Sequence, residues 1–330
     1  MITESIRILE HLRHPSGLFV AAPAGDTGYG KAAWIRDNVY EAMGLEAAGK
    51  DTVKTYHSLL DILLKHEYKI DYAIHEKPQQ KYQYIHARYD PETGNEFWDE
   101  WGNKQNDAVG ALLFKIGDLE SRGIRVIRNG DDLRMVQKLV HYLESVRYWE
   151  DRDNGIWEKE EEVHASSIGA CVAGLRKVSK LVKVDPSLVK KGMDALEAIL
   201  PYETPEGKVD LALLSLIYPY DIVSARQKRQ ILGLVESRLV RKMGVIRHQG
   251  DYYYRNESGE AEWTFGFPWL AIIYKRLGNL RKHAEYARKT LIVMNEKGEL
   301  PELYYAGTGK HNDNSPLGWA QAMYLIMVNS

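Results

Sequence analysis

Apolar side chains recur at three- and four-residue spacing along most of the chain, the pattern of amphipathic helices packed on a core. Local signals support the helix ends. Asp185 before Pro186 predicts an N-cap, and Gly49, Gly123 and Gly278 can end helices in a left-handed conformation. The expected helices span residues 2–13, 34–49, 51–67, 102–121, 131–150, 164–183, 186–200, 209–217, 225–240, 262–277, 280–296 and 316–328.

Three segments lack this pattern: 69–100, 244–262 and 298–315. The first alternates apolar and polar residues, which predicts either a β-hairpin or a long excursion over one face. No linker or composition shift interrupts the chain, so we expect one domain, 1–330. Twelve helices arranged as six hairpins predict an all-α fold, an (α/α)6 barrel whose loops build a cleft at one end.

Composition excludes several classes of function. The 44 basic and 46 acidic residues give a net charge of −2, which offers no electrostatic footprint for nucleic acid or an anionic membrane. No apolar run approaches the roughly 18–20 residues of a membrane span, and the N-terminus lacks a signal-peptide core. Cys171 is the one cysteine, on an apolar helix face. We therefore expect a cytoplasmic protein with an inert thiol, no disulfide, no metal and no cofactor.

Aromatic usage is unusual, with 8 Trp and 21 Tyr but 5 Phe. Tyr and Trp combine a flat apolar face with a hydrogen-bonding edge, and sugars offer the complementary surface. The alternative is a core that uses tyrosine for packing.

Two motifs place such rings beside polar groups just before an apolar helix. Their candidate residues are Trp34, Arg36 and Asp37 in the first, and Trp101, Gln105 and Asp107 in the second. Each motif predicts either a sugar-binding wall with hydrogen-bonding groups or an ordinary helix start, in which Asp37 interacts with the helix dipole.

Two glutamates follow constrained turns. Glu158 comes after the turn Asp153–Gly155 and beside Trp157, whose indole is expected to desolvate the acid and raise its pKa. The alternative is a solvated acidic loop, because a run of glutamates follows. Glu302 comes after Pro301, with Tyr304, Tyr305 and Trp319 expected around it. Glycoside hydrolysis requires such a pair of carboxyls, one acid and one base or nucleophile.

Nine short motifs in series resemble glycoside hydrolase family 15, the glucoamylase family, and still more closely the related N-terminal domain of phosphorylase kinase alpha and beta subunits. The motifs are GLFVAA, AWIRDNVY (33–40), EWGNKQNDAVG (100–110), DNGIWE (153–158), HASS (164–167), VDLALLS (209–215), EWTFGFPW (262–269), LPELYY (300–305) and LGWAQAMYL (317–325). The resemblance implies an (α/α)6 barrel that hydrolyses terminal α-linked glucose with inversion, without a cofactor.

The resemblance also assigns roles to residues. Glu158 would be the general acid and Glu302 the general base. Arg36, Asp37 and Arg247 would hold the terminal glucose, Trp34, Trp101, Trp157 and Trp319 would line the pocket, and Arg88 would reach the next sugar.

Two positions depart from the glucoamylase pattern, since Lys159 replaces a second acid and Leu303 stands where Gln is frequent. The linkage, α-1,4, α-1,6 or α,α-1,1, therefore stays open. No starch-binding module is recognisable, which favours a short α-linked gluco-oligosaccharide. The alternatives are a non-catalytic glucan-binding regulatory domain, as in the kinase subunits, and an inverting phosphorylase, which Glu302 disfavours.

Overall fold

The computed structural model describes residues 1–23, 28–99 and 101–330, and its regular structure is almost entirely helical. The α-helices are α1 (Ile2–Leu12), α2 (Ile35–Ala47), α3 (Val53–Lys65), α4 (Glu67–His75), α5 (Asn106–Ser121), α6 (Gly130–Val146), α7 (Ala165–Val178), α8 (Pro186–Ile199), α9 (Ala225–Arg238), α10 (Gly266–Arg276), α11 (Leu280–Val293) and α12 (Gly318–Asn329). The 3-10 helices are η1 (Lys81–Gln83) and η2 (Leu211–Leu216). Two antiparallel strand pairs join β1 (Ala33–Trp34) to β2 (Arg88–Tyr89) and β3 (Glu262–Trp263) to β4 (Leu303–Tyr304).

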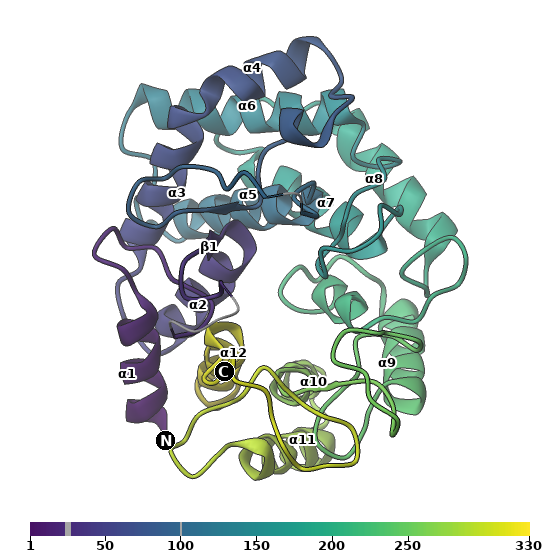
Figure 1. Cartoon of the computed structure of the whole chain (residues 1–330). Coiled ribbons are helices and arrows are strands. Elements are labelled where there is room, and N and C mark those ends of the chain that lie inside the picture. Colours follow the sequence, from purple (N-terminus) through teal and green to yellow (C-terminus); the bar gives the residue numbers. More distant parts are fainter. Residues whose placement is uncertain (24–27, 100) are drawn as a thin grey trace.

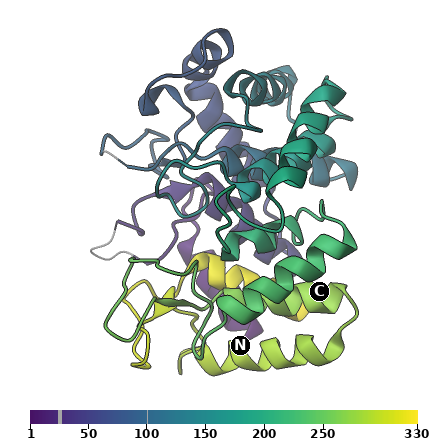
Figure 2. The same cartoon turned by 90° about the vertical axis from the view of Figure 1, so that its right-hand side faces the viewer.

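The helices form two concentric rings. The inner ring runs α2, α5, α7, η2, α10 and α12, and α12 packs against α2 to close it. Helices α1, α3, α4, α6, α8, α9 and α11 surround this ring (Figure 1). The predicted (α/α)6 barrel is therefore confirmed. Seen from the side, the connections that precede α2, α10 and α12 gather at one end of the ring (Figure 2).

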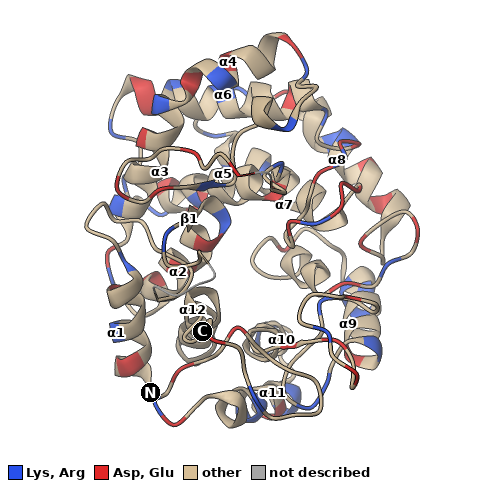
Figure 3. Cartoon of the chain, viewed as in Figure 1, with Lys and Arg blue, Asp and Glu red and all other residues tan. Residues whose placement is uncertain are grey.

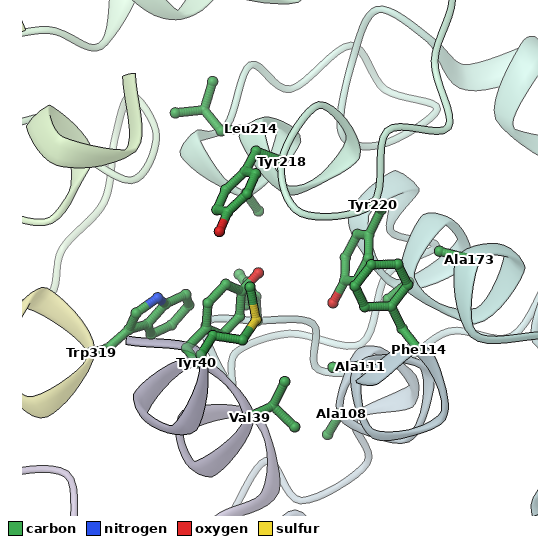
Figure 4. Packing of buried hydrophobic residues seen from close by; sticks show 14 of the residues in the cluster. Val39, Tyr40, Ala108, Ala111, Phe114, Ala173, Leu214, Tyr218, Tyr220 and Trp319 are labelled. Atoms are coloured by element: carbon green, nitrogen blue, oxygen red, sulfur yellow. The ribbon is translucent and has the colours of Figure 1, made fainter. Parts of the chain in front are cut away.

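Burial explains why the two rings differ in sequence. Inner helices are buried on nearly all faces, so α7 is apolar or small from Ala165 to Leu175, whereas an outer helix such as α8 buries a single stripe. Side chains from the inner helices fill the interior of the ring. Figure 4 shows Tyr40 of α2 beside Trp319 of α12 and facing Tyr218, which follows η2. The barrel centre is a packed core rather than a channel.

Charges lie mainly on the outer helices, with both signs interspersed (Figure 3). No helix among the described residues is both long enough and apolar enough to span a bilayer.

Several expected ends are confirmed. The Asp185 side chain accepts a hydrogen bond from the Ser187 amide with Pro186 at the first helical position, and Gly49, Gly123 and Gly278 have φ of 75°, 78° and 73°.

Three expectations are wrong. The segment 69–100 contains most of α4, and its strand β2 pairs with β1 rather than within a local hairpin. Residues 209–217 form the 3-10 helix η2 instead of an α-helix. The helices expected from 102 and 262 begin at Asn106 and Gly266, since Gln105 before α5 is extended and Glu262–Trp263 before α10 form the strand β3.

The closest packing in the inner ring lies between α5 and α7, where Gly110 meets the backbone of the facing helix. A Cβ atom at Gly110 would lie 2.4 Å from the Ala170 carbonyl carbon and 2.5 Å from the Cys171 nitrogen. Backbone atoms cannot move aside as a flexible side chain can, so this crossing requires glycine.

We expect Gly110→Ala to destabilise the fold by about 1–3 kcal/mol, since the added methyl group forces α5 and α7 apart. Gly233→Ala in α9 is the matched control. Nothing lies within 4 Å of a Cβ there, so alanine should stabilise the helix by about 0.5–1 kcal/mol. Denaturant unfolding measures both, and equal stabilities for the two variants would contradict the close crossing.

Candidate active site

A pocket of about 460 Å³ lies at the end of the ring where the inner helices begin. It is lined by Ala21, Tyr29, Trp34, Arg36, Asp37, Ile156, Trp157, Glu158, Arg247, Trp263, Glu302, Leu317 and Trp319. Many of these residues lie just before an inner helix or in its first turn. Trp34 precedes α2, Trp263 precedes α10, and Leu317 precedes α12. The pocket is therefore built where the N-terminal ends of the inner helices converge.

Eight of the ten predicted site residues line this pocket. They are Trp34, Arg36, Asp37, Trp157, Glu158, Arg247, Glu302 and Trp319. The other two lie beside it: the Arg88 guanidinium carbon is 4.1 Å from the Trp101 ring centroid and 5.6 Å from that of Trp34. Arg88 also pairs with Asp99. Residue 100, the first of the second aromatic motif, lies outside the described residues.

Arg36 is buried at the base of the pocket and joins three chain segments. Its Nη1 donates to Gln105 Oε1 at 2.7 Å and to Asp107 Oδ2 at 3.1 Å, and its Nη2 donates to Glu158 Oε1 at 2.8 Å. Burial alone would lower the pKa of Arg36, but Asp107, Glu158 and Asp37 together raise it above its ordinary value. Arg36 therefore stays charged and fixes the Glu158 loop to the start of α5.

Glu158 is held by its backbone as well. The residue has φ of 62°, a left-handed conformation that is costly for a side chain with a Cβ. Gly102 lies beneath it, where a Cβ would come within 2.6 Å of the Glu158 carbonyl oxygen. Burial raises the pKa of Glu158 to about 8, against the opposing effect of Arg36. Burial thus favours the protonated form of this carboxyl, the direction expected from the sequence for an acid beside Trp157.

Glu302 is fully buried and has a different environment. Its Oε1 accepts a hydrogen bond from the Tyr29 hydroxyl at 2.9 Å, and its Oε2 accepts from the side-chain amides of Asn314, at 2.8 Å, and Asn312. Burial raises the pKa of Glu302, whereas the three donors and Arg247 act to lower it. Hydrogen-bond donors favour the ionised form of a carboxyl.

The expected surroundings of Glu302 need correction. Trp319 lines the same pocket, but the Tyr304 hydroxyl donates to the Val293 carbonyl at the end of α11, and Tyr305 packs against Tyr254. The pairing of β4 with β3 fixes Tyr304 in this direction. Sequence reasoning missed Tyr29, Asn312 and Asn314. The one available signal was two amides spaced two residues apart in an irregular segment.

A second buried ion-pair network holds Arg247. Asp251, with no exposed surface, accepts from Arg247 Nε at 2.6 Å and Nη2 at 2.9 Å, and it also pairs with Lys159. The Arg247 guanidinium stacks over Trp263, with its carbon 4.7 Å from the ring centroid. This ion pair directs Lys159, the residue that departs from the glucoamylase pattern, toward Asp251. Lys159 is therefore not among the residues that line the pocket.

The remaining lining residues are aromatic or aliphatic, apart from the carboxyl of Asp37. Trp34, Trp157, Trp263 and Trp319 form walls. The Trp157 Nε1 donates to Asp210 Oδ1 at 2.7 Å, which fixes that ring. Burial raises the pKa of Asp37 to about 6. Within the part of the chain that the structure describes, no group of three or more His, Cys, Asp or Glu side chains gathers as metal ligands. The pocket thus offers flat apolar faces, two guanidinium groups and three carboxyls.

Comparison with known proteins agrees with this arrangement. The model of Glycosyl hydrolases family 15 matches residues 2–196. A protein of Caenorhabditis elegans named probable phosphorylase b kinase regulatory subunit alpha is 26% identical over 89% of this chain. The chain spans about 30% of that protein's length.

Solved structures share the fold, and two of them illustrate the likeness. A glycosidase variant in complex with glucose superposes with a TM-score of 0.85 and 19% identity, covering 99% of this chain and 95% of that one. A bacterial glucoamylase complexed with acarbose superposes with a TM-score of 0.72 and 17% identity, covering 99% of this chain and 54% of the other.

The raised pKa of Glu158 makes stability depend on pH. Between the ordinary value of 4.5 and about 8, the folded state holds a proton that the unfolded state releases, so rising pH destabilises the fold. Glu158→Gln has no titrating group at this position, so it does not lose stability in this way as the pH rises. We expect its free energy of unfolding, relative to the parent chain, to rise by up to about 1.4 kcal/mol per pH unit across this interval.

Glu160→Gln is the control on the same loop. The pKa of Glu160 lies below its ordinary value, chiefly because of a backbone hydrogen bond, so its effect on stability should be constant from about pH 5 to 8. Urea unfolding at several pH values measures both variants. Parallel curves for Glu158→Gln and the parent chain would contradict a protonated Glu158.

Proposed function

This chain belongs to Glycosyl hydrolases family 15, and we propose that it is an inverting, exo-acting α-glucosidase of the glucoamylase type. It would release β-glucose from the non-reducing ends of short α-glucosides. One observation carries the proposal: Glu158 and Glu302 come from separate loops and line one pocket, where Glu158 pairs with Arg36 and Glu302 accepts hydrogen bonds from three neutral donors.

In the proposed reaction Glu158 is the general acid. Its proton passes to the glycosidic oxygen as the bond to the anomeric carbon breaks through an oxocarbenium-like transition state. Arg36, within hydrogen-bond distance of Glu158 Oε1, stabilises the carboxylate that forms. A group with a pKa near 8 is poised to give up a proton at neutral pH.

Glu302 is the proposed general base. It takes a proton from a water molecule that attacks the opposite face of the sugar ring, so the product has inverted configuration. Inverting pairs are typically about 6.5–9.5 Å apart, which leaves room for this water. Tyr29, Asn312 and Asn314 fix the orientation of the carboxylate, so that its remaining lone pairs are pre-positioned.

The proposed exo action follows from burial. Trp34, Arg36, Arg247 and Trp319 are each 4% exposed or less, so the pocket is recessed and suits one terminal sugar rather than the middle of a chain. Asp37 and the two guanidinium groups would bind glucose hydroxyls, and the tryptophans would pack on the C–H faces of the ring. Arg88 and Trp101, one layer outward, would contact the next sugar.

A second function is favoured by the named relatives. The similar kinase proteins are called regulatory subunits, and a binding domain could keep this pocket without turnover. Such a domain would bind glucose-like inhibitors and release no sugar.

Incubation with maltose, maltotriose, isomaltose, trehalose and panose, followed by NMR, separates the two functions and identifies the linkage. We expect β-glucose as the first product. Glu158→Gln and Glu302→Gln should each lower kcat by about 10²–10⁴-fold, the range of general acid–base catalysis.

Initial α-glucose would retain an enzyme but contradict inversion. No release from any sugar, combined with thermal stabilisation by acarbose, would favour the binding domain.

The contact between Tyr29 and Glu302 makes a separate prediction. Tyr29→Phe removes one donor worth about 1 kcal/mol, so the pKa of Glu302 should rise by about 0.7. The acidic limb of the pH profile of kcat/KM should then move to higher pH by the same amount. Tyr304→Phe is the control, because that hydroxyl bonds Val293 instead. An unshifted limb in Tyr29→Phe would argue against Glu302 as the base.

A further inference from the structure

A groove outside the pocket lies between α4 and η1 and is lined by Tyr68, Lys69, Tyr72, Tyr82 and Gln83. We call it the tyrosine groove. Tyr68, Tyr72 and Tyr82 are 68%, 41% and 70% exposed, although large aromatic residues are usually buried. Clustered apolar rings at a surface mark interaction sites more often than isolated ones do.

The helix itself does not require these rings. Helix α4 turns Ile70 and Ala73 toward the core, while Tyr68 and Tyr72, four residues apart, lie on the outward side. Leaving such rings in water forgoes the stabilisation that burial would give. Their placement therefore suits a ligand that covers them.

Hydrogen bonds preform the groove. Gln83 Nε2 donates to the Tyr72 hydroxyl at 3.0 Å, and this hydroxyl donates to Glu76 Oε2 at 3.1 Å. Gln83 Oε1 accepts from the backbone amides of Gln79 and Gln80 at 2.8 and 2.9 Å. The wall between the two elements is thus fixed before any ligand arrives, which lowers the ordering cost of binding.

The chemistry of the groove points to a neutral ligand. The one cation among the lining residues, Lys69, is 2.6 Å from a Glu96 carboxylate oxygen, so no unpaired cation lines the groove to select an anion. Flat rings with hydroxyl and amide edges match the C–H faces and hydroxyl rims of sugars. Five lining residues suit a few sugar units better than a protein interface, which typically uses about 20–30 residues on each side.

The segment that carries Trp101 also contacts one side of the groove. Asn103 Nδ2 donates to the Lys81 carbonyl of η1 at 3.2 Å, and the Lys104 ammonium lies 4.4 Å from the centroid of the Tyr84 ring. The segment that carries these contacts also carries Trp101 beside Arg88. The groove and the residues beside the pocket thus share contacts with one short segment, 101–104.

We propose that the tyrosine groove binds an α-glucan strand on the surface, apart from the pocket. The choice of α-glucan rests on the proposed function; the groove itself is independent of it. The groove would hold a longer glucan outside the pocket.

Calorimetric titration of the whole chain with β-cyclodextrin, in saturating acarbose, tests this. A cyclodextrin has no non-reducing end, so an exo pocket cannot take it, and acarbose blocks that pocket in any case. We expect binding by the parent chain and an increase in Kd of at least tenfold in Tyr68→Ala and in Tyr82→Ala. Leu280→Ala on α11, with 65% exposure, is the matched control and should bind normally. Maltose hydrolysis should be unchanged in all three variants.

Absence of binding, loss of binding in acarbose, or equal binding by the tyrosine variants would overturn the proposal. The proposal would also be overturned if the parent chain did not bind cyclodextrin but self-associated, and the tyrosine variants lost that self-association. The groove would then be an interface between copies of the chain. Because the readout is binding, a hydrolytically inactive chain that still binds cyclodextrin through the groove would refute the proposed function alone.

Discussion

The fold and the pocket both depend on the hydrogen bonds and ion pairs of the buried Arg36 guanidinium. Taking a cation out of water costs several kcal/mol unless partners replace its hydration, and breaking such a set leaves an uncompensated charge. Gln105, Asp107 and Glu158 supply the partners from two further parts of the chain. The charge that orients the proposed acid therefore also ties α2 to α5 at the head of the inner ring.

The two glutamates show how one pocket can surround two carboxyls with different partners. Glu158 has one charged partner, and desolvation dominates its pKa. Glu302 is more deeply buried, yet the Tyr29 hydroxyl and two asparagine amides donate hydrogen bonds to its carboxyl in place of water. Hydrogen bonds to the charged form compensate for lost water, whereas apolar walls do not. The two glutamates therefore differ both in depth of burial and in the number of hydrogen-bond donors around the carboxyl.

The features that could be predicted from the sequence are those that depend on the local pattern of residues. Most helices, their glycine and aspartate ends, and pocket residues beside helix starts such as Arg36 and Trp319 were predictable, whereas Arg247 came from the family resemblance alone. Helix α4 was missed because Tyr68, Ile70, Tyr72 and Ile74 alternate as in a strand, and the outward tyrosines hide the helical period. Tyr29 could not be paired with Glu302 in advance, since their contact depends on how distant loops meet at the end of the ring.

The closure of the ring has a consequence for biosynthesis. Helix α12 packs on α2 so closely that a Cβ at Gly44 would lie 2.5 Å from the Ala322 Cα, yet more than two hundred residues separate the two helices. A ribosome adds roughly 5–20 residues per second, so α2 waits on the order of tens of seconds for its neighbour. During translation its apolar flank stays uncovered, and the nascent chain has to be shielded from aggregation until α12 emerges.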